Sequence, residues 1–151
     1  MEEQLKEHVE RVEAIFGELG YDIFERDITD EMYQASFGKD SEVTGSIFIE
    51  NECNFVEMAY TYVFEREEED FLKEHLESMM NICYVYGIYF NIMREEDEIS
   101  FSIFSKLYFS GLNVESLQDT IGDFISCNSE LASMFNVEEN DNSSEGRFYN
   151  E

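Results

Sequence analysis

Few side chains in this sequence are suited to nucleophilic or metal chemistry. They are two histidines, His8 and His75, and three cysteines, Cys53, Cys83 and Cys127. A serine or cysteine nucleophile needs a neighbouring base, most often histidine, and no catalytic motif joins these residue types here. We interpret both histidines as solvated or packing residues, and we expect no catalytic residue and no enzyme activity.

The cysteines lack the spacing of a zinc site or a disulfide framework. Their number is odd and no C-x-x-C motif joins any two of them, so reduced, mostly buried thiols are the simplest interpretation. Such thiols are typical of the cytoplasm. The N-terminus shows no secretory signal, and no stretch approaches the roughly 18 apolar residues of a membrane span. We therefore expect a cytoplasmic protein.

Carboxylates are the abundant functional groups. The chain carries 36 Asp and Glu against 9 Lys and Arg, a formal net charge of −27 over 151 residues. The acidic runs at 65–70 and 95–98 would attract a hard cation, but neither has the alternating ligand spacing of a calcium loop. The charge repels phosphates and anionic membranes and attracts basic surfaces. We expect a solvated acidic rim, no metal or other cofactor, and no direct binding to nucleic acid or membrane.

Hydrophobic periodicity predicts the elements that would position these groups. Apolar residues recur at three- and four-residue spacings in three segments, which predicts helices over residues 1–20, 66–86 and 113–135. Alternation of apolar and polar residues predicts strands at 21–27, 33–37, 43–49, 54–64, 88–92 and 99–109. Short polar turns between these strands make neighbours antiparallel.

The predicted fold class is α+β: a single antiparallel sheet of about five or six strands with helices packed on it, in the order α-β-β-β(-β)-α-β-β-α. The number of strands before Arg66 is left open. We expect one domain over residues 1–135 and an acidic, mobile tail over residues 136–151, where periodicity is lost. The predicted core comprises Val9, Val12, Phe16, Ile47, Leu72, Leu76, Met79, Ile103, Leu117, Ile121 and Phe124.

Three short segments in this pattern resemble the YbjN family, whose fold is similar to that of type III secretion chaperones. They are LGY at 19–21, MNI at 80–82 and SGLNVESL at 110–117. The resemblance covers about residues 1–135 and carries no catalytic residue. It implies a non-enzymatic bacterial protein, chaperone-like or regulatory, that binds a protein segment, and it also implies a homodimer. The sequence departs from the family pattern in its extra length before Arg66 and in its high charge.

The predicted partner-binding residues lie on the strand at 54–64 and on the acidic run after it. Apolar residues on both faces of this strand imply cover on both faces, by the protein's own helices or by a partner. The candidates are Val56, Met58, Tyr60, Tyr62, Glu67, Glu68, Glu69 and Asp70. We expect the partner to be a protein with a basic or apolar segment.

A second hypothesis assigns the charge itself to binding. An acidic surface that imitates a phosphate backbone would occupy the basic groove of a DNA- or RNA-binding protein, as an anti-defence inhibitor of a phage or plasmid does. Acidic residues occur in every predicted element and in the tail. A third interpretation is that the charge only maintains solubility. The sequence leaves these alternatives open, and binding through an apolar surface is favoured.

Overall fold

In the residues that the structure describes, the fold combines three helices with antiparallel strands. The computed structural model describes residues 2–142 and 148–149, with side-chain burial over residues 2–136. Helix α1 (Glu3–Glu18) is followed by β1 (Asp22–Ile28), β2 (Met32–Lys39), β3 (Glu42–Glu50) and β4 (Phe55–Glu65). The 3-10 turn η1 (Arg66–Glu68) leads into α2 (Glu69–Val85), β5 (Tyr89–Arg94) and β6 (Glu98–Tyr108). The 3-10 turn η2 (Phe109–Gly111), α3 (Val114–Asn142) and β7 (Phe148–Tyr149) complete the order.

The strands form one antiparallel sheet in the order β1-β2-β3-β4-β6-β5, and β7 pairs with β4. The first four strands are neighbours in sequence, whereas β5 and β6 form a hairpin that joins β4 through β6. β4 and β6 pair over their full length, from Phe55 opposite Tyr108 to Glu65 opposite Glu98. The predicted α+β class and single antiparallel sheet are confirmed, with four strands before Arg66.

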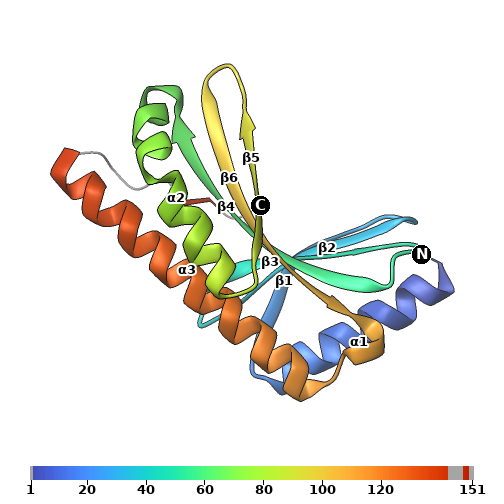
Figure 1. The fold of residues 1–151 in the computed structure, drawn as a ribbon. Coiled ribbons are helices and arrows are strands. Elements are labelled where there is room, and N and C mark those ends of the chain that lie inside the picture. Colours follow the sequence, from blue (N-terminus) through green and yellow to red (C-terminus); the bar gives the residue numbers. More distant parts are fainter. Residues whose placement is uncertain (1, 143–147, 150–151) are drawn as a thin grey trace.

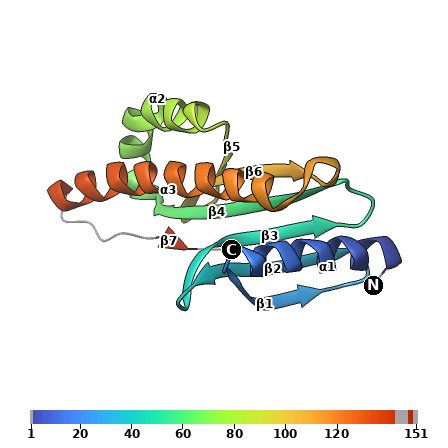
Figure 2. The same ribbon diagram turned by 90° about the horizontal axis from the view of Figure 1, so that it is seen from below.

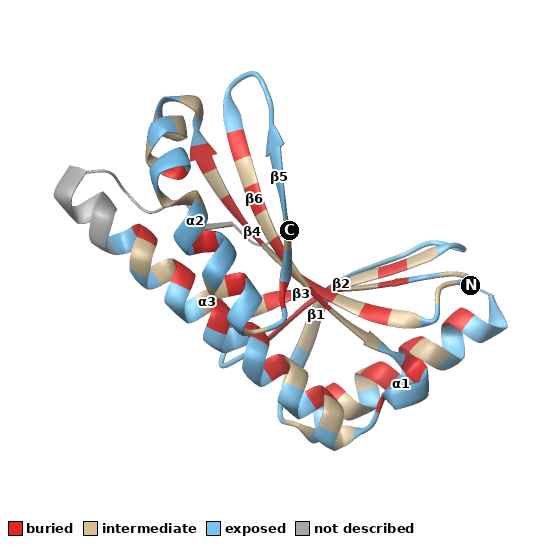
Figure 3. Ribbon diagram, in the orientation of Figure 1, coloured by how far each residue is buried: buried red, intermediate tan, exposed pale blue. Residues whose placement is uncertain are grey.

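The three helices lie on one side of a strongly twisted sheet (Figures 1 and 2). α1 packs against β1, β2 and β3, whereas α3 packs against β6 and α2 against β5. Alternate strand residues are buried beneath the helices, including Tyr33, Ala35 and Phe37 of β2 (Figure 3). The alternation of buried and less buried residues is clearest along β6, where a period of two defines the core face.

The predicted core residues are buried with one exception, Leu76, which is partly exposed. Leu76 lies on the same face of α2 as the buried residues Leu72 and Met79, but it borders an open pocket. Helical periodicity identifies a face without showing whether other elements cover its whole length.

Two helix boundaries differ by three or more residues from those predicted. The helix predicted over 66–86 begins at Glu69, because Arg66–Glu68 form η1, which is closed by a capping box between Glu65 and Glu68. The helix predicted to end at 135 continues to Asn142, because polar residues prolong a helix whose earlier turns are already packed. Residues 136–142 of the predicted mobile tail are thus helical. Residues 143–147 and 150–151 of that tail lie outside the described residues.

Positive backbone φ angles mark the tight turns. Asp40 and Ser41 have φ values of 54° and 67°, as in a type I′ turn, whose twist matches a two-stranded hairpin. Gly20, at φ 89°, follows α1, and Gly87, at φ 66°, follows α2. Glu25 has φ 54° and lies where the register between β1 and β2 shifts, so β1 contains a bulge.

Candidate protein-binding surface

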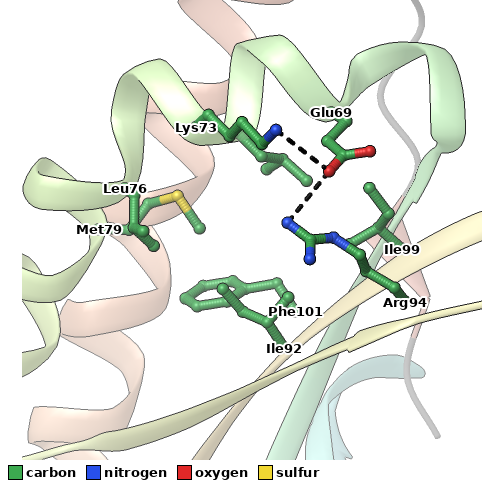
Figure 4. Close-up of a pocket in the computed structure, with 9 residues that line it drawn as sticks. Glu69, Lys73, Leu76, Met79, Ile92, Arg94, Ile99 and Phe101 are labelled. Carbon is green, nitrogen blue, oxygen red and sulfur yellow. Dashed lines mark ion pairs between the residues drawn. The ribbon is translucent and has the colours of Figure 1, made fainter.

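An apolar pocket opens between α2 and the hairpin of β5 and β6 (Figure 4). Ile92 and Phe101 lie across it from Leu76 and Met79 (Figure 4). Its cavity volume is about 50 Å³, which accommodates the end of one aliphatic side chain. The lining residues are Glu69, Leu72, Lys73, Leu76 and Met79 of α2, Ile92 and Arg94 of β5, and Ile99 and Phe101 of β6.

Glu69 gathers three cations at the mouth of this pocket. Its Oε2 lies 3.0 Å from Nη2 of Arg94 and 3.5 Å from Nζ of Lys73 (Figure 4), and its Oε1 lies 3.3 Å from Nη2 of Arg66. Burial acts to raise the pKa of Glu69, but Arg94, Lys73 and Arg66 together outweigh it and hold this pKa below its ordinary value. The first turn of α2 is thereby tied to β5 by an ionised carboxylate.

β5 is an edge strand with little protection. It is the last strand in the sheet order, and its sequence, YFNIMR, has one charged residue, at its end. Its register with β6 runs from Tyr89 to Arg94 without a bulge. Tyr89, Ile92 and Met93 are 44%, 37% and 55% exposed, and Figure 3 shows most of β5 in the colour of exposed residues. Natural proteins usually shield such edges with charges, prolines or bulges, because a bare edge pairs with other chains.

The opposite edge of the sheet is shielded in two ways. Four of the seven residues of β1, DIFERDI, are charged, and the bulge at Glu25 interrupts its register. Arg26 of β1 is also held by α1, because its Nε donates to Glu13 Oε2 at 2.8 Å. Of the two edges of the described sheet, β5 is therefore the one suited to strand addition.

Exposed apolar side chains are concentrated in the segment of the chain that ends in β5. Ten large apolar side chains are exposed in the part of the chain whose burial is described, and six of them fall between residues 80 and 93. They come from the C-terminal half of α2 and from β5: Met80, Tyr84, Val85, Tyr89, Ile92 and Met93. Such local enrichment is typical of a protein-binding surface.

The β4 residues predicted to bind a partner lie in the core. Val56 and Met58 are 0% exposed and Tyr62 is 1% exposed. The Tyr62 hydroxyl donates to the main-chain carbonyl of Asn128 in α3 at 3.2 Å, so the protein's own helices cover this face. Tyr60 is partly exposed and packs edge-on against Tyr62. Val56, Met58 and Tyr62 are therefore not accessible to a partner, whereas Tyr60 keeps part of its surface exposed. The strand with exposed apolar side chains is β5.

Cross-strand contacts shield part of the other face of β4. The Lys106 ammonium lies 4.1 Å from the centroid of the Phe55 ring, and Phe55 packs edge-on against Tyr108 with 5.8 Å between centroids. Glu57 lies opposite Lys106 in the register. Burial raises the pKa of Glu57 above its ordinary value, an effect that Lys106 opposes.

The acidic candidates have different surroundings. Glu68 accepts a hydrogen bond from the main-chain N–H of Glu65 at 2.9 Å and so closes η1. Glu69 holds the three cations at the pocket. Glu67 and Asp70 are exposed on either side of these two. The run is therefore partly structural, and Glu67 and Asp70 are its accessible charges.

Both histidines make packing contacts. The His8 ring stacks on Phe109 with 3.7 Å between centroids, and burial, reinforced by Arg11, lowers its pKa. Nδ1 of His75 lies 2.8 Å from the main-chain oxygen of Phe71 in the preceding turn of α2. These contacts fit the interpretation of the histidines as packing residues.

The thiols differ in accessibility. Cys83 of α2 and Cys127 of α3 are buried, and Cys53 is partly exposed.

Among the described residues, no group of three His, Cys, Asp or Glu side chains is arranged to hold a metal ion. None of the helices in the described part of the chain combines the length and the apolar character that crossing a bilayer requires.

Sequence reasoning missed Ile92 and Met93 as surface residues. It predicted a strand at 88–92, but alternation cannot show that a strand lies at the edge of a sheet. The one available signal was composition: β5 lacks the charges that guard β1. A comparison of the charged residues in the predicted strands would have identified β5 as a strand with an unprotected edge.

These features define an α+β domain whose antiparallel sheet has helices on one side and one unprotected edge. A solved structure of similar fold is that of an uncharacterized protein from Methanothermobacter thermautotrophicus, with a TM-score of 0.65 and 14% sequence identity. The alignment covers 85% of this chain and 96% of that one. No family model matches the chain, and no curated protein matches it. At this identity the likeness concerns the fold alone.

Proposed function

We propose that this protein is a non-enzymatic, chaperone-like or regulatory module that binds an extended segment of another protein along the free edge of β5, as its resemblance to the YbjN family implies. The observation that supports this most directly is the exposed apolar edge of β5 beside an open pocket. An added segment would continue the sheet through main-chain hydrogen bonds, and its alternate side chains would provide specificity. In this proposal the protein acts in the bacterial cytoplasm, where its cysteines stay reduced.

The pocket would take one side chain of the bound segment. Ile92 and Arg94, alternate residues of β5, both line it, so side chains on the same face of an added strand point towards α2. A volume of about 50 Å³ suits the end of Val, Leu or Ile. The anchor of the partner is therefore one aliphatic residue, with further apolar residues at alternate positions.

Charge favours basic residues around that anchor. A net charge of −27 attracts cationic segments and raises their association rate. Glu67 and Asp70 are exposed at the start of α2, whereas the Glu69 carboxylate at the pocket mouth is already paired with three cations of this chain. Two copies of this chain repel each other, so a basic segment of another protein is favoured over a second copy as the occupant of the edge.

A matched set of variants tests this proposal. The probe is a fluorescein-labelled peptide, Lys-Lys-Val-Thr-Leu-Thr-Val-Lys-Lys, titrated by anisotropy against the wild type, Ile92→Lys and Met93→Lys. The control is Ile28→Lys, which adds the same charge at a 46% exposed position of β1. We expect both β5 variants to weaken binding at least tenfold, about 1.4 kcal/mol, and the control to bind like the wild type. Equal affinities for all four proteins would refute docking at β5.

The competing interpretations predict other results. An inhibitor that mimics nucleic acid would capture a DNA-binding protein from host lysate at low salt and release it to competing DNA or to high salt. Capture at β5 instead survives high salt and is lost in Met93→Lys but not in Ile28→Lys. Light scattering adds a further test, because a dimer abolished by Met93→Lys would assign this edge to a second copy.

A further inference from the structure

The sheet divides between β3 and β4, and the division leaves a second strand edge inside the molecule. β3 and β4 share three register pairs, the last of them Ser46 opposite Ala59. Beyond Ala59 the two strands diverge (Figure 1), whereas β4 stays paired with β6 as far as Glu65. From Tyr60 onwards, β4 therefore presents to the β3 side a main-chain edge that β3 does not use.

The C-terminal residues of the chain occupy part of this edge. β7 runs antiparallel to β4, with Tyr149 opposite Thr61 and Phe148 opposite Tyr62. Figure 2 shows β7 in the opening between β4 and β3. The pairing covers two of the six β4 residues that follow Ala59. A strand this short is held by few hydrogen bonds and opens more easily than the long ladders of the sheet.

The edge keeps its strand conformation without β3 because both faces of β4 are fixed. Thr61 is 2% exposed, and its hydroxyl lies 2.7 Å from the Ser102 hydroxyl of β6. On the other face, Tyr62 donates to Asn128 of α3, and the Phe64 ring packs edge-on against Phe135 of α3. A main chain held in this way is already in the strand conformation, so little conformational entropy is lost from β4 when another strand pairs with it.

We propose that the β3-side edge of β4, from Tyr60 to Phe64, is a strand-docking site, and that the chain's own C-terminal strand, Phe148–Tyr149, is its resident, exchangeable ligand. The site is separate from the β5 edge and does not rest on the proposed function. It accepts an extended segment whose main chain pairs with β4, and the attached C-terminal residues compete with any such segment from outside.

The test uses the full chain and a peptide of its last eight residues, SEGRFYNE, labelled with fluorescein. A variant with Phe148→Pro and Tyr149→Pro lacks the main-chain N–H of both β7 residues, because proline has none. The N–H that faces β4 is therefore lost, since the N–H groups of adjacent strand residues point to opposite sides. The matched control, Phe148→Ala with Tyr149→Ala, keeps both N–H groups. In the proline variant we expect hydrogen exchange to rise at least tenfold at the main-chain amides within residues 60–64 that face β7, whereas the amides that donate to β6 stay protected. Exchange over residues 99–103 of β6 stays unchanged and is the internal reference for the fold.

The peptide provides a second readout. We expect it to bind the proline variant at least tenfold more tightly than the wild type, because an attached strand has a high effective concentration at its own site. The alanine variant should be closer to the wild type than the proline variant is, both in hydrogen exchange over residues 60–64 and in its affinity for the peptide. Unchanged exchange over residues 60–64 in the proline variant, or equal peptide binding by all three proteins, would overturn the proposal. So would a wild-type dimer that the proline variant lacks, since the resident strand would then come from a second copy.

Discussion

Replacing Gly45 by alanine probes the point where the sheet divides. A Cβ atom at residue 45 would lie 3.0 Å from the main-chain oxygen of Ala59, 3.0 Å from Cε2 of Phe124 and 3.1 Å from Cε1 of Phe37. Phe124 and Phe37 are both 0% exposed, so neither ring has space to move into. The Ala59 carbonyl belongs to the main chain of β4, which is paired on both sides at this point.

The expected cost follows from these contacts. Forcing an additional methyl group into a packed core costs about 1–3 kcal/mol, and three close neighbours place Gly45→Ala near the middle, at about 2 kcal/mol. For a domain of this size, that lowers Tm by about 4–8 °C. With a urea m-value of about 2 kcal/mol/M, it lowers the unfolding midpoint by about 1 M.

Urea unfolding followed by far-UV circular dichroism measures this effect, and Gly122→Ala is the matched control. Gly122 lies within α3, and a Cβ atom there would meet nothing within 4 Å. Alanine in a helix interior is about 1 kcal/mol more favourable than glycine, so this variant should be more stable than the wild type. A Gly45→Ala protein as stable as the wild type, beside a stabilised Gly122→Ala protein, would refute the tight approach of β3 and β4.

Three further outcomes are expected. Tyr62→Phe removes a buried hydrogen bond to α3 and should lower the free energy of unfolding by about 1 kcal/mol, measured by thermal denaturation; an unchanged Tm would contradict it. Hydrogen bonding to Arg26 lowers the pKa of Glu13 from its ordinary 4.5, so this ion pair stabilises the fold at neutral pH and ceases to do so as the pH falls through the lowered pKa. The stability difference between the wild type and Glu13→Gln should therefore shrink below about pH 4.5, and a constant difference would argue against the pair. Iodoacetamide should modify Cys53 in the folded protein and reach the two buried cysteines after unfolding in urea, as mass spectrometry would show; rapid modification of all three without urea would contradict their burial.

The sequence predicted most of the fold because burial imposes a period on each element. Val9, Val12 and Phe16 repeat as one face of a helix, and they are buried on α1. The same argument located β6, whose residues Ile99 and Phe101 alternate with serines. Such patterns lie within short segments of the sequence, so they can be recognised without the three-dimensional structure.

The candidate surface could not be predicted in the same way because it depends on distant pairings. β5 lies at an edge because β6 inserts beside β4, and residues far apart in sequence form that pairing. Tyr62 and Ile92 both alternate with neighbours in apolar strands, but α3 covers the first and leaves the second exposed. The end of α3 was missed for another reason, since Val137 is the one apolar residue among residues 136–142 and a single apolar residue sets no period.

The unguarded β5 edge also has a consequence for colloidal behaviour. A bare apolar edge normally invites association between copies, yet every copy of this protein carries a charge of −27. Mutual repulsion acts over a screening length of about 8 Å at physiological ionic strength, which is longer than the spacing of about 4.8 Å between paired strands. Net repulsion of this range opposes the approach of two β5 edges, whereas the same field would attract a basic segment. The net charge of the whole molecule therefore opposes edge-to-edge association at β5, as the bulge and the charged side chains do at β1.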